Sequence, residues 1–455
     1  MRKILISGVA VALTAGLAGS ALAQVVGQPT LLPPSRSTAA KPLRPAVKSP
    51  RQAAQPAKAP STPEARSAAA LALSADPVFD EGTYQRIKEA LLSYSALQVR
   101  GGWPMLPAEA KLGPGASGPE VALLRQRLVI GDDLARDKET GEGYDADVVE
   151  AVKRFQLRHG LDGTGAVNAP TLHALNVPIG ARIKQLEASL ERLLGMDFTF
   201  AERYVVVNIP AAFAEAVAND KVERRYRVIV GKTDKPSPTL SVYITAINLN
   251  PTWTVPLSIT KNEIINRMRK DPSYLSRMHM RVIGPHDADV DPQSIDWASD
   301  RSPNFTVRQD AGAWNALGNL KIDMPNPYAV YMHDTDARRL FDKDYRFDSH
   351  GCTRVDNVRD LAAWILQDVP GWNRAAIDAG IAGGVTKVVN LPHKMPVAWV
   401  YLTGWVTRDG TVQFRDDIYK HDEVLDRTAL TDAVTAGGFV QPVPKVKQVS
   451  NLDSR

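Results

Sequence analysis

The hydrophobic pattern has a helical period in the first part of the chain. Residues 83–99 carry apolar side chains three or four positions apart, three shorter stripes of the same kind lie within 117–178, and another lies within 181–195. This spacing places the apolar side chains on one face of a helix. Asp145 and Asn168 directly precede two of the stripes, where a side chain that accepts backbone N–H groups starts a helix well. We predict helices here.

From about residue 200 to about residue 420 the pattern alternates with a period of two. These segments are rich in Val, Ile, Tyr and Thr, and Asn219-Asp220 and Asp409-Gly410 separate two pairs of them as hairpin turns do. Residues 258–323 interrupt the pattern with a helix and then a polar loop. We expect either a lid that shapes a substrate site or a simple surface insertion.

The start of the chain has the features of an export signal. Arg2 and Lys3 precede an apolar run that ends at Ala21-Leu22-Ala23. This order is typical of a signal peptide, here residues 1–23. The alternative is an uncleaved anchor, but the core is rich in Gly, Ala, Ser and Thr, whereas a spanning helix needs about 20 strongly apolar residues. We therefore expect an exported, soluble protein.

Charge is unevenly distributed along the chain. The net charge of the chain is +5, yet residues 1–75 hold nine Lys and Arg residues against the single acid Glu64, so the rest carries −3. A mildly acidic folded part argues against a nucleic-acid partner. Residues 24–75 are dense in Pro, Ala, Lys and Ser, which predicts a disordered tether. It is either a solubilising spacer or a basic segment held near an acidic polymer.

Taken together, these patterns predict a multidomain α+β protein in which a helical scaffold precedes a mainly β domain. The predicted segments are 1–23 signal peptide, 24–75 tether, 76–116 helical scaffold, 117–178 three-helix domain, 179–200 connecting helix, 201–425 catalytic domain with the insertion at 258–323, and 426–455 carboxyl-terminal tail.

The chain has one cysteine, Cys352, in the polar stretch Asp348-Ser349-His350-Gly351-Cys352-Thr353-Arg354. Exported domains often pair their cysteines, but a lone thiol excludes an intramolecular disulfide. An inert buried thiol, an intermolecular bridge and a reactive nucleophile remain. The polar neighbours do not look like a core, and nearby cations lower a thiol pKa. We therefore favour the nucleophile and expect a lowered pKa.

A histidine accompanies this thiol. The segment Tyr328–Met332 reads as a strand with His333 at its end, and Cys352 follows nineteen residues later, before a helical stripe that starts near Asn357. An imidazole beside a thiol can take its proton and return it to a leaving amine. His333, His350 and Cys352 can also be considered as zinc ligands, but no further Cys/His pair completes a site.

The order His333, then Ser349-His350-Gly351-Cys352-Thr353-Arg354, resembles the signature of the YkuD-type L,D-transpeptidases. With the helical amino-terminal part, the chain is similar to the large YcbB-like subgroup over about residues 80–425. Thr353 stands where Ile or Val is commoner, and this departure removes no reacting group. Residues 117–178 resemble the peptidoglycan-binding-type three-helix domain, which implies either a module that docks on the wall or a scaffold.

The resemblance implies a transferase of cell-wall biogenesis in the periplasm of a Gram-negative bacterium, acting without a cofactor or metal. Cys352 would attack a tetrapeptide stem, release D-alanine and form a thioester. A diaminopimelate side-chain amine would then resolve the thioester into a third-to-third cross-link. The implied partners are therefore donor and acceptor stem peptides, with glycan strands in addition if the three-helix domain binds them. Carbapenems would acylate the same thiol.

Each implied role falls on a residue of the signature. His333 is the general base and acid, and backbone N–H groups around Gly351 and Cys352 face the oxyanion. Ser349 and His350 shape the loop, with His350 tuning the thiolate. Arg354 pairs either a substrate carboxylate or the acidic residues of its own loop.

Three rival functions use the same chain differently. Water instead of an amine would make the enzyme an L,D-carboxypeptidase, and a protein acceptor would attach outer-membrane proteins to peptidoglycan. A non-catalytic wall-binding scaffold is the third, which the presence of both His333 and Cys352 disfavours.

Overall fold

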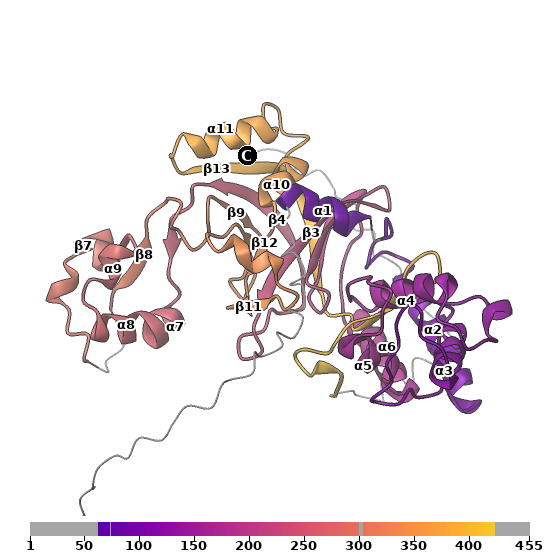
Figure 1. The fold of residues 1–455 in the computed structure, drawn as a ribbon. Coiled ribbons are helices and arrows are strands. Elements are labelled where there is room, and N and C mark those ends of the chain that lie inside the picture. Colours follow the sequence, from indigo (N-terminus) through magenta and orange to yellow (C-terminus); the bar gives the residue numbers. More distant parts are fainter. Residues whose placement is uncertain (1–61, 73, 300–303, 424–455) are drawn as a thin grey trace, which may run out of the picture. The chain divides into compact units, whose positions relative to one another are not determined.

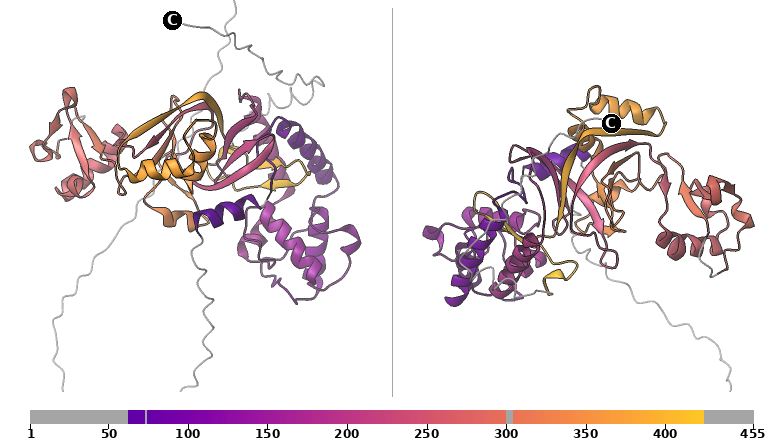
Figure 2. Two further views of the ribbon diagram at one scale, coloured as in Figure 1. Left: turned by 90° about the horizontal axis from the view of Figure 1, so that it is seen from above. Right: turned by 180° about the vertical axis from the view of Figure 1, so that it is seen from behind.

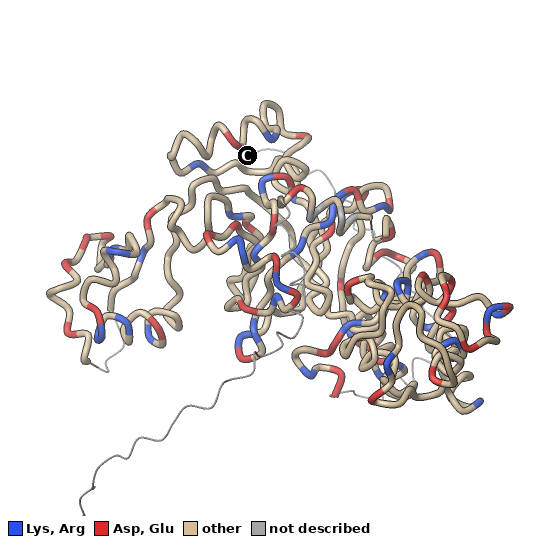
Figure 3. The backbone as a smooth tube through the Cα atoms, in the orientation of Figure 1, with Lys and Arg blue, Asp and Glu red and all other residues tan. Residues whose placement is uncertain are grey.

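The computed structural model describes residues 62–72, 74–299 and 304–423 (Figure 1). The predicted signal peptide, most of the predicted tether and nearly all of the predicted carboxyl-terminal tail lie outside these ranges. No helix within the described residues is long and apolar enough to cross a membrane. Basic and acidic residues are interspersed along the described backbone (Figure 3).

The amino-terminal part is helical, as predicted. Its helices are α1 (Pro63–Leu71), α2 (Thr83–Val99), α3 (Pro119–Ile130), α4 (Ala146–Arg158), α5 (Ala169–Leu175) and α6 (Ile179–Leu194). Asp145 accepts from the Val148 N–H and Asn168 from the Thr171 N–H, so both predicted N-caps are confirmed. Helices α3, α4 and α5 enclose a core of their own around Leu124, which makes the three-helix domain a packed unit.

The prediction of a disordered tether is wrong for its last residues. Residues 63–71 form α1, and the chain after α1 is held against strand β3 (Lys221–Gly231). The Arg225 guanidinium donates to the carbonyls of Ala70 and Ser74, and the Val222 N–H donates to the carbonyl of Ala75. Local composition does not reveal these partners, because they lie about 150 residues away along the chain.

The mainly β domain is built on one large sheet, whose other strands are β1 (Arg203–Asn208), β2 (Phe213–Ala218), β4 (Leu240–Leu249), β9 (Leu320–Asp323), β10 (Met332–His333), β11 (Phe347–Ser349), β12 (Thr353–Val355) and β13 (Lys387–Val400). The strand order is β11-β3-β12-β10-β9-β4-β13-β1-β2, and β2 also pairs with β3. The last pairing closes the sheet on itself. Asn219 and Asp220 both have positive φ in the β2–β3 turn, as a tight hairpin requires.

The two faces of this sheet have different partners. On one face, alternate residues such as Val207, Ile322 and Trp399 join a core with α10 (Val358–Ile365) and α11 (Arg374–Ala382). On the other face, Val206 and its neighbours on β1 and β13 pack against α2 and α6 and the hairpin of β14 (Gly404–Val406) and β15 (Val412–Phe414). Figure 2 shows α11 lying over the sheet from two further directions. Both faces of the sheet are therefore covered by other elements of the fold.

The insertion is a small folded unit, not a helix followed by a polar loop. It contains a four-stranded sheet of β5 (Trp253–Thr254), β8 (Thr306–Gln309), β6 (Met280–Ile283) and β7 (Asp289–Val290). Its helical part is α7 (Leu257–Ile259), a π-helical turn η2 (Thr260–Ile264), α8 (Ile265–Lys270) and α9 (Tyr274–Arg277). Buried side chains of both parts, including Ile264, Met268 and Val307, make its own core.

The predicted bounds of the insertion, 258–323, are also wrong at both ends. Strand β5 already belongs to the sheet of the insertion, whereas β9 belongs to the main sheet. The strands of the insertion are only two to four residues long, which is too short for an alternating pattern to stand out in the sequence. The predicted strand Tyr328–Met332 is shorter than expected as well, because Ala329 has a φ of 52° and the extended pairing begins only at Met332.

Candidate active site

Sheet register places His333 and Cys352 on neighbouring strands and on one face. Strand β10 pairs in parallel with β12, with Met332 opposite Thr353 and His333 opposite Arg354. Met332 and Thr353 are fully buried on the inner side. Because side chains alternate between the faces of a strand, His333, Cys352 and Arg354 point to the opposite face. The fold therefore brings together the thiol and the imidazole that the sequence singled out.

The loop before Cys352 is held by its own polar groups. Gly351 has a φ of 107°, a conformation that side chains disfavour, which explains glycine at this position. The Ser349 hydroxyl donates to the Cys352 carbonyl at 2.5 Å and accepts from the Gly351 N–H at 3.2 Å. The Ser237 hydroxyl donates to the Gly351 carbonyl at 2.7 Å. These bonds fix the position of the thiol.

The hydrogen bonds of this loop show which backbone N–H group is free to bind an oxyanion. The Gly351 N–H, which we expected to face an oxyanion, already donates to Ser349. Within the described residues the Cys352 N–H has no hydrogen-bond partner. The Cys352 N–H is therefore the better candidate donor.

The Cys352 thiol has a raised pKa, contrary to the expectation from its sequence neighbours. The side chain is half-buried and makes no disulfide. Burial raises the pKa, and this effect outweighs hydrogen bonding from the Tyr331 backbone and hydroxyl and the charges of Lys321 and Arg354, which all act in the lowering direction. The resting group is thus a thiol that needs a base.

His333 is arranged as a neutral base. Its ring is buried, and Nδ1 lies 2.5 Å from the Asp334 carbonyl oxygen. Since a carbonyl only accepts, Nδ1 carries the proton and Nε2 keeps the lone pair. Burial first, and then the charge of Arg354, lowers the pKa of His333 to about 3. The imidazole therefore stays unprotonated, as a proton acceptor for a thiol must be.

Two residues near the thiol were not predicted from the sequence. Tyr331 lies two positions before His333, and its ring centroid is 5.7 Å from that of the imidazole. Lys321 pairs with His333 across β9 and β10, and its Nζ lies 4.5 Å from the centre of the Tyr331 ring and 2.6 Å from Asp323. The alternation of Lys321 and Asp323 was a visible signal, but only the strand pairing connects it to the thiol.

Arg354 is a cation without a carboxylate in contact. Its Nε is buried and unbonded, and no acid within the described residues lies close enough for an ion pair. Burial lowers its pKa, while the more distant charges of Asp348 and Asp336 oppose this shift. Of the two roles considered for Arg354, binding a substrate carboxylate fits this geometry better than fixing the loop to its acids.

His350 contacts the insertion. Its Nε2 lies 2.6 Å from Oε1 of Glu263 in η2, and both side chains are partly exposed. His350 is not among the groups that shift the pKa of Cys352. The expectation that it tunes the thiolate therefore gains no support, whereas a role in loop shape agrees with the contact.

Two further features concern ligands. No three His, Cys, Asp or Glu side chains of the described residues are placed to hold a metal ion.

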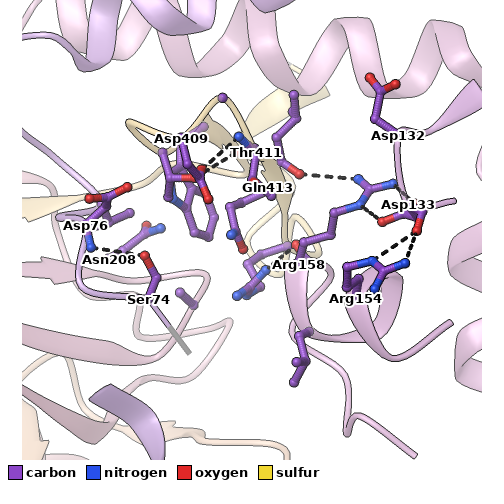
Figure 4. Close-up of a pocket in the computed structure, with 18 of the residues that line it drawn as sticks. Ser74, Asp76, Asp132, Asp133, Arg154, Arg158, Asn208, Asp409, Thr411 and Gln413 are labelled. Carbon is purple, nitrogen blue, oxygen red and sulfur yellow. Dashed lines mark hydrogen bonds and ion pairs between the residues drawn. The ribbon is translucent and has the colours of Figure 1, made fainter. Parts of the chain in front are cut away.

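A cavity of about 600 Å³ lies where α4 meets the β14–β15 hairpin and the strands beside it (Figure 4). Its wall includes Asp133, Arg158 and Gln413 but none of the predicted site residues. The cavity is thus separate from the thiol.

Known sequence families match two parts of the chain. Residues 117–175 match the family described as "Putative peptidoglycan binding domain", and residues 202–389, which include His333 and Cys352, match the L,D-transpeptidase catalytic domain of the YkuD family. Residues 202–389 are therefore similar to L,D-transpeptidase catalytic domains, the family that the sequence signature resembles. The predicted combination of the two domains is confirmed, and so is the predicted fold class.

A curated protein is similar to about half of this chain. The chain is 31% identical over 223 residues to a Haemophilus influenzae protein named "Putative L,D-transpeptidase", a match that covers 49% of this chain and 45% of that protein. The chain therefore matches less than half of the length of this relative.

Solved structures of L,D-transpeptidases resemble this chain with low TM-scores. One from Mycobacterium smegmatis has 17% identity and a TM-score of 0.22 and covers 44% of this chain and 58% of its own. One from Stackebrandtia nassauensis has 12% identity and a TM-score of 0.22 and covers 54% and 86%.

Proposed function

We propose that this L,D-transpeptidase domain cross-links peptidoglycan through a thioester on Cys352. The observation that carries the proposal is the pairing of a half-buried free thiol with a buried, neutral imidazole on the neighbouring strand. A thiol with a raised pKa needs a base, and a histidine with a lowered pKa is one.

In the first step the Cys352 sulfur attacks the carbonyl between the third residue of a tetrapeptide stem and its terminal D-alanine. His333 Nε2 takes the thiol proton. The carbon–nitrogen bond then breaks, and the D-alanine amine leaves with that proton. The carbonyl oxygen, which becomes negative in between, is stabilised by the Cys352 N–H. The product is a thioester, free D-alanine and a neutral His333.

In the second step a diaminopimelate side-chain amine of another stem attacks the thioester. The new amide bond forms as the carbon–sulfur bond breaks, and the amine proton passes through His333 to the sulfur. The amide bond broken in the first step supplies the energy, so the exchange needs no nucleotide. The proposed site of action is the periplasm, where the substrate lies, which agrees with the predicted signal peptide at residues 1–23.

The test is intact-protein mass spectrometry of the mature chain mixed with disaccharide tetrapeptide. We expect an adduct on Cys352 that lacks D-alanine and a product one D-alanine lighter than two substrates. A Cys352→Ala variant should form neither product and should unfold close to the temperature of the wild type, because the thiol makes no disulfide and its loss removes few contacts. Processing of stems by this variant would contradict the mechanism.

The same experiment separates the rival functions. Release of D-alanine with tripeptide as the sole product would identify a carboxypeptidase, and a requirement for a protein acceptor would identify protein attachment. Absence of any adduct, with stems or with a carbapenem, would leave a wall-binding scaffold.

A further inference from the structure

Charge is distributed unequally along the chain around Cys352. Two residues after the thiol, Arg354 offers a cation without an acid in contact, and Lys321 lies on the same face two strands away. Two residues before it, His350 contacts the carboxylate of Glu263. The catalytic loop therefore has cations on its strand side and contacts a carboxylate of the insertion.

Glu263 is held at this place by an unusual piece of helix. It lies in the π-helical turn η2, between α7 and α8, and the following residue Ile264 anchors the turn in the core of the insertion. Single π-helical turns inside helices are rare and frequently lie at functional sites. The geometry directs one carboxylate from the insertion to the catalytic loop.

The contact between Glu263 and His350 leaves one carboxylate oxygen of Glu263 free to bind a ligand. Only Oε1 of Glu263 is bonded to His350, and within the described residues Oε2 has no partner. The side chains of Glu263 and His350 are 37% and 31% exposed, so a ligand can reach both. A partly exposed ion pair contributes only about 0–1 kcal/mol to stability. The ion pair therefore contributes little to holding the insertion against the catalytic loop, and stability alone does not explain the contact.

We infer that Glu263, positioned by His350, forms the subsite for the acceptor amine. The inference rests on the proposed function and names the ligand class of one side of its site. The donor stem ends in the carboxylate of D-alanine, which complements Arg354. The acceptor brings a primary amine, which is largely an ammonium at neutral pH and complements Glu263.

The acceptor step balances with this assignment. Glu263 attracts the ammonium and raises its local concentration beside the thioester. The ammonium loses one proton to solvent before it attacks. The amine then forms the amide bond while the carbon–sulfur bond breaks, and its second proton returns to the sulfur through His333. Water carries no positive charge, so Glu263 favours cross-linking over hydrolysis.

The experiment separates the two half-reactions in the mature chain. The Glu263→Gln variant keeps the size of the side chain and removes its charge. Asp287→Asn is the matched control, because Asp287 is an exposed acid elsewhere on the insertion whose left-handed backbone suits asparagine. The probes are D-alanine release for the donor step and cross-linked product against acceptor concentration for the acceptor step.

For Glu263→Gln we expect the acceptor KM to rise roughly threefold to tenfold, with hydrolysis gaining at the expense of cross-links. The burst of D-alanine release should keep its rate, and Glu263→Asp should recover part of the loss. Asp287→Asn should match the wild type in both steps.

Three results would overturn the inference. An unchanged ratio of cross-linking to hydrolysis in Glu263→Gln would show that the carboxylate does not serve the acceptor. A slower burst of D-alanine release would show that it acts on the catalytic loop instead. A wild type that forms no thioester would overturn the proposed function, and this inference with it.

Discussion

Two buried histidines in this protein share their local chemistry and differ in their surroundings. His333 and His159 both donate Nδ1–H to a backbone carbonyl, at 2.5 Å from Asp334 and 2.7 Å from Phe155. Both have lowered pKa values, with burial as the main cause. His159, however, stacks on Phe155 and Phe414, with ring centroids 3.9 Å and 5.7 Å apart, whereas His333 lies on the strand that pairs with the one following Cys352. A lowered pKa alone therefore does not identify a catalytic residue.

The residues next to His159 join the three-helix domain to the β14–β15 hairpin. The neighbouring Arg158 forms a buried ion pair with Asp133 at 2.5 Å and donates to the Val412 carbonyl at 3.3 Å. Arg415 donates back to the Arg158 carbonyl at 3.0 Å. These bonds hold α4 against the β14–β15 hairpin.

The largest effect on rate should come from replacing His333. His333→Gln should slow carbapenem acylation of Cys352 by roughly 10²–10⁴-fold, because the thiol loses its base. The measurement is the rate of adduct formation by mass spectrometry, with circular dichroism as the control for folding. A loss below about tenfold would mean that another group takes the proton.

The pH dependence should come next in size. The pKa of His333 is lowered from 6.5 to about 3, so the imidazole should remain a base at pH 5. We expect the acylation rates at pH 5 and pH 7 to agree within about twofold, whereas an ordinary histidine would lose about thirtyfold. The stability linked to this group is present above pH 6.5 and is lost as the pH falls toward 3, because the unfolded state binds the proton first. An acid limb near pH 6.5 in a folded enzyme would contradict the assigned base.

A smaller effect should follow from the cation near His333. Arg354→Gln should raise the KM for stem donors by about fivefold to tenfold, since a charge-assisted contact to the substrate carboxylate is lost. The same change removes a positive charge that lowers the pKa of His333, so that pKa should rise. Arg354→Lys, which keeps the charge, should preserve the pKa. Equal KM values in wild type and Arg354→Gln would assign the arginine to the loop alone.

The smallest effect on rate should be that of His159→Gln. Acylation should stay within about twofold of the wild type, because this ring touches no reacting atom. The free energy of unfolding should fall by about 1–2 kcal/mol through the loss of stacking on Phe155 and Phe414. Denaturant titration measures this loss. A strong loss of acylation with intact folding would break the comparison and indicate coupling between the two domains.

Much of this protein can be predicted from local sequence. Helical stripes, the N-caps Asp145 and Asn168 and the turn at Asn219-Asp220 depend on neighbours a few positions away, so pattern and propensity predict them. The lone cysteine in a polar segment, with a histidine upstream, likewise indicates the reacting pair from residue types and spacing alone. These features are properties of short segments.

Other features depend on contacts between residues that are far apart in the sequence. The pKa of Cys352 rises because burial outweighs its cationic neighbours, and the amount of burial depends on strands packed from distant parts of the chain. Lys321 joins the site only through the register of β9 and β10, and Glu263 only through the fold of the insertion. Sequence alone thus determined which groups can react. Tertiary structure decided their protonation and their partners, because both depend on the solvent and charge that folding places around each group.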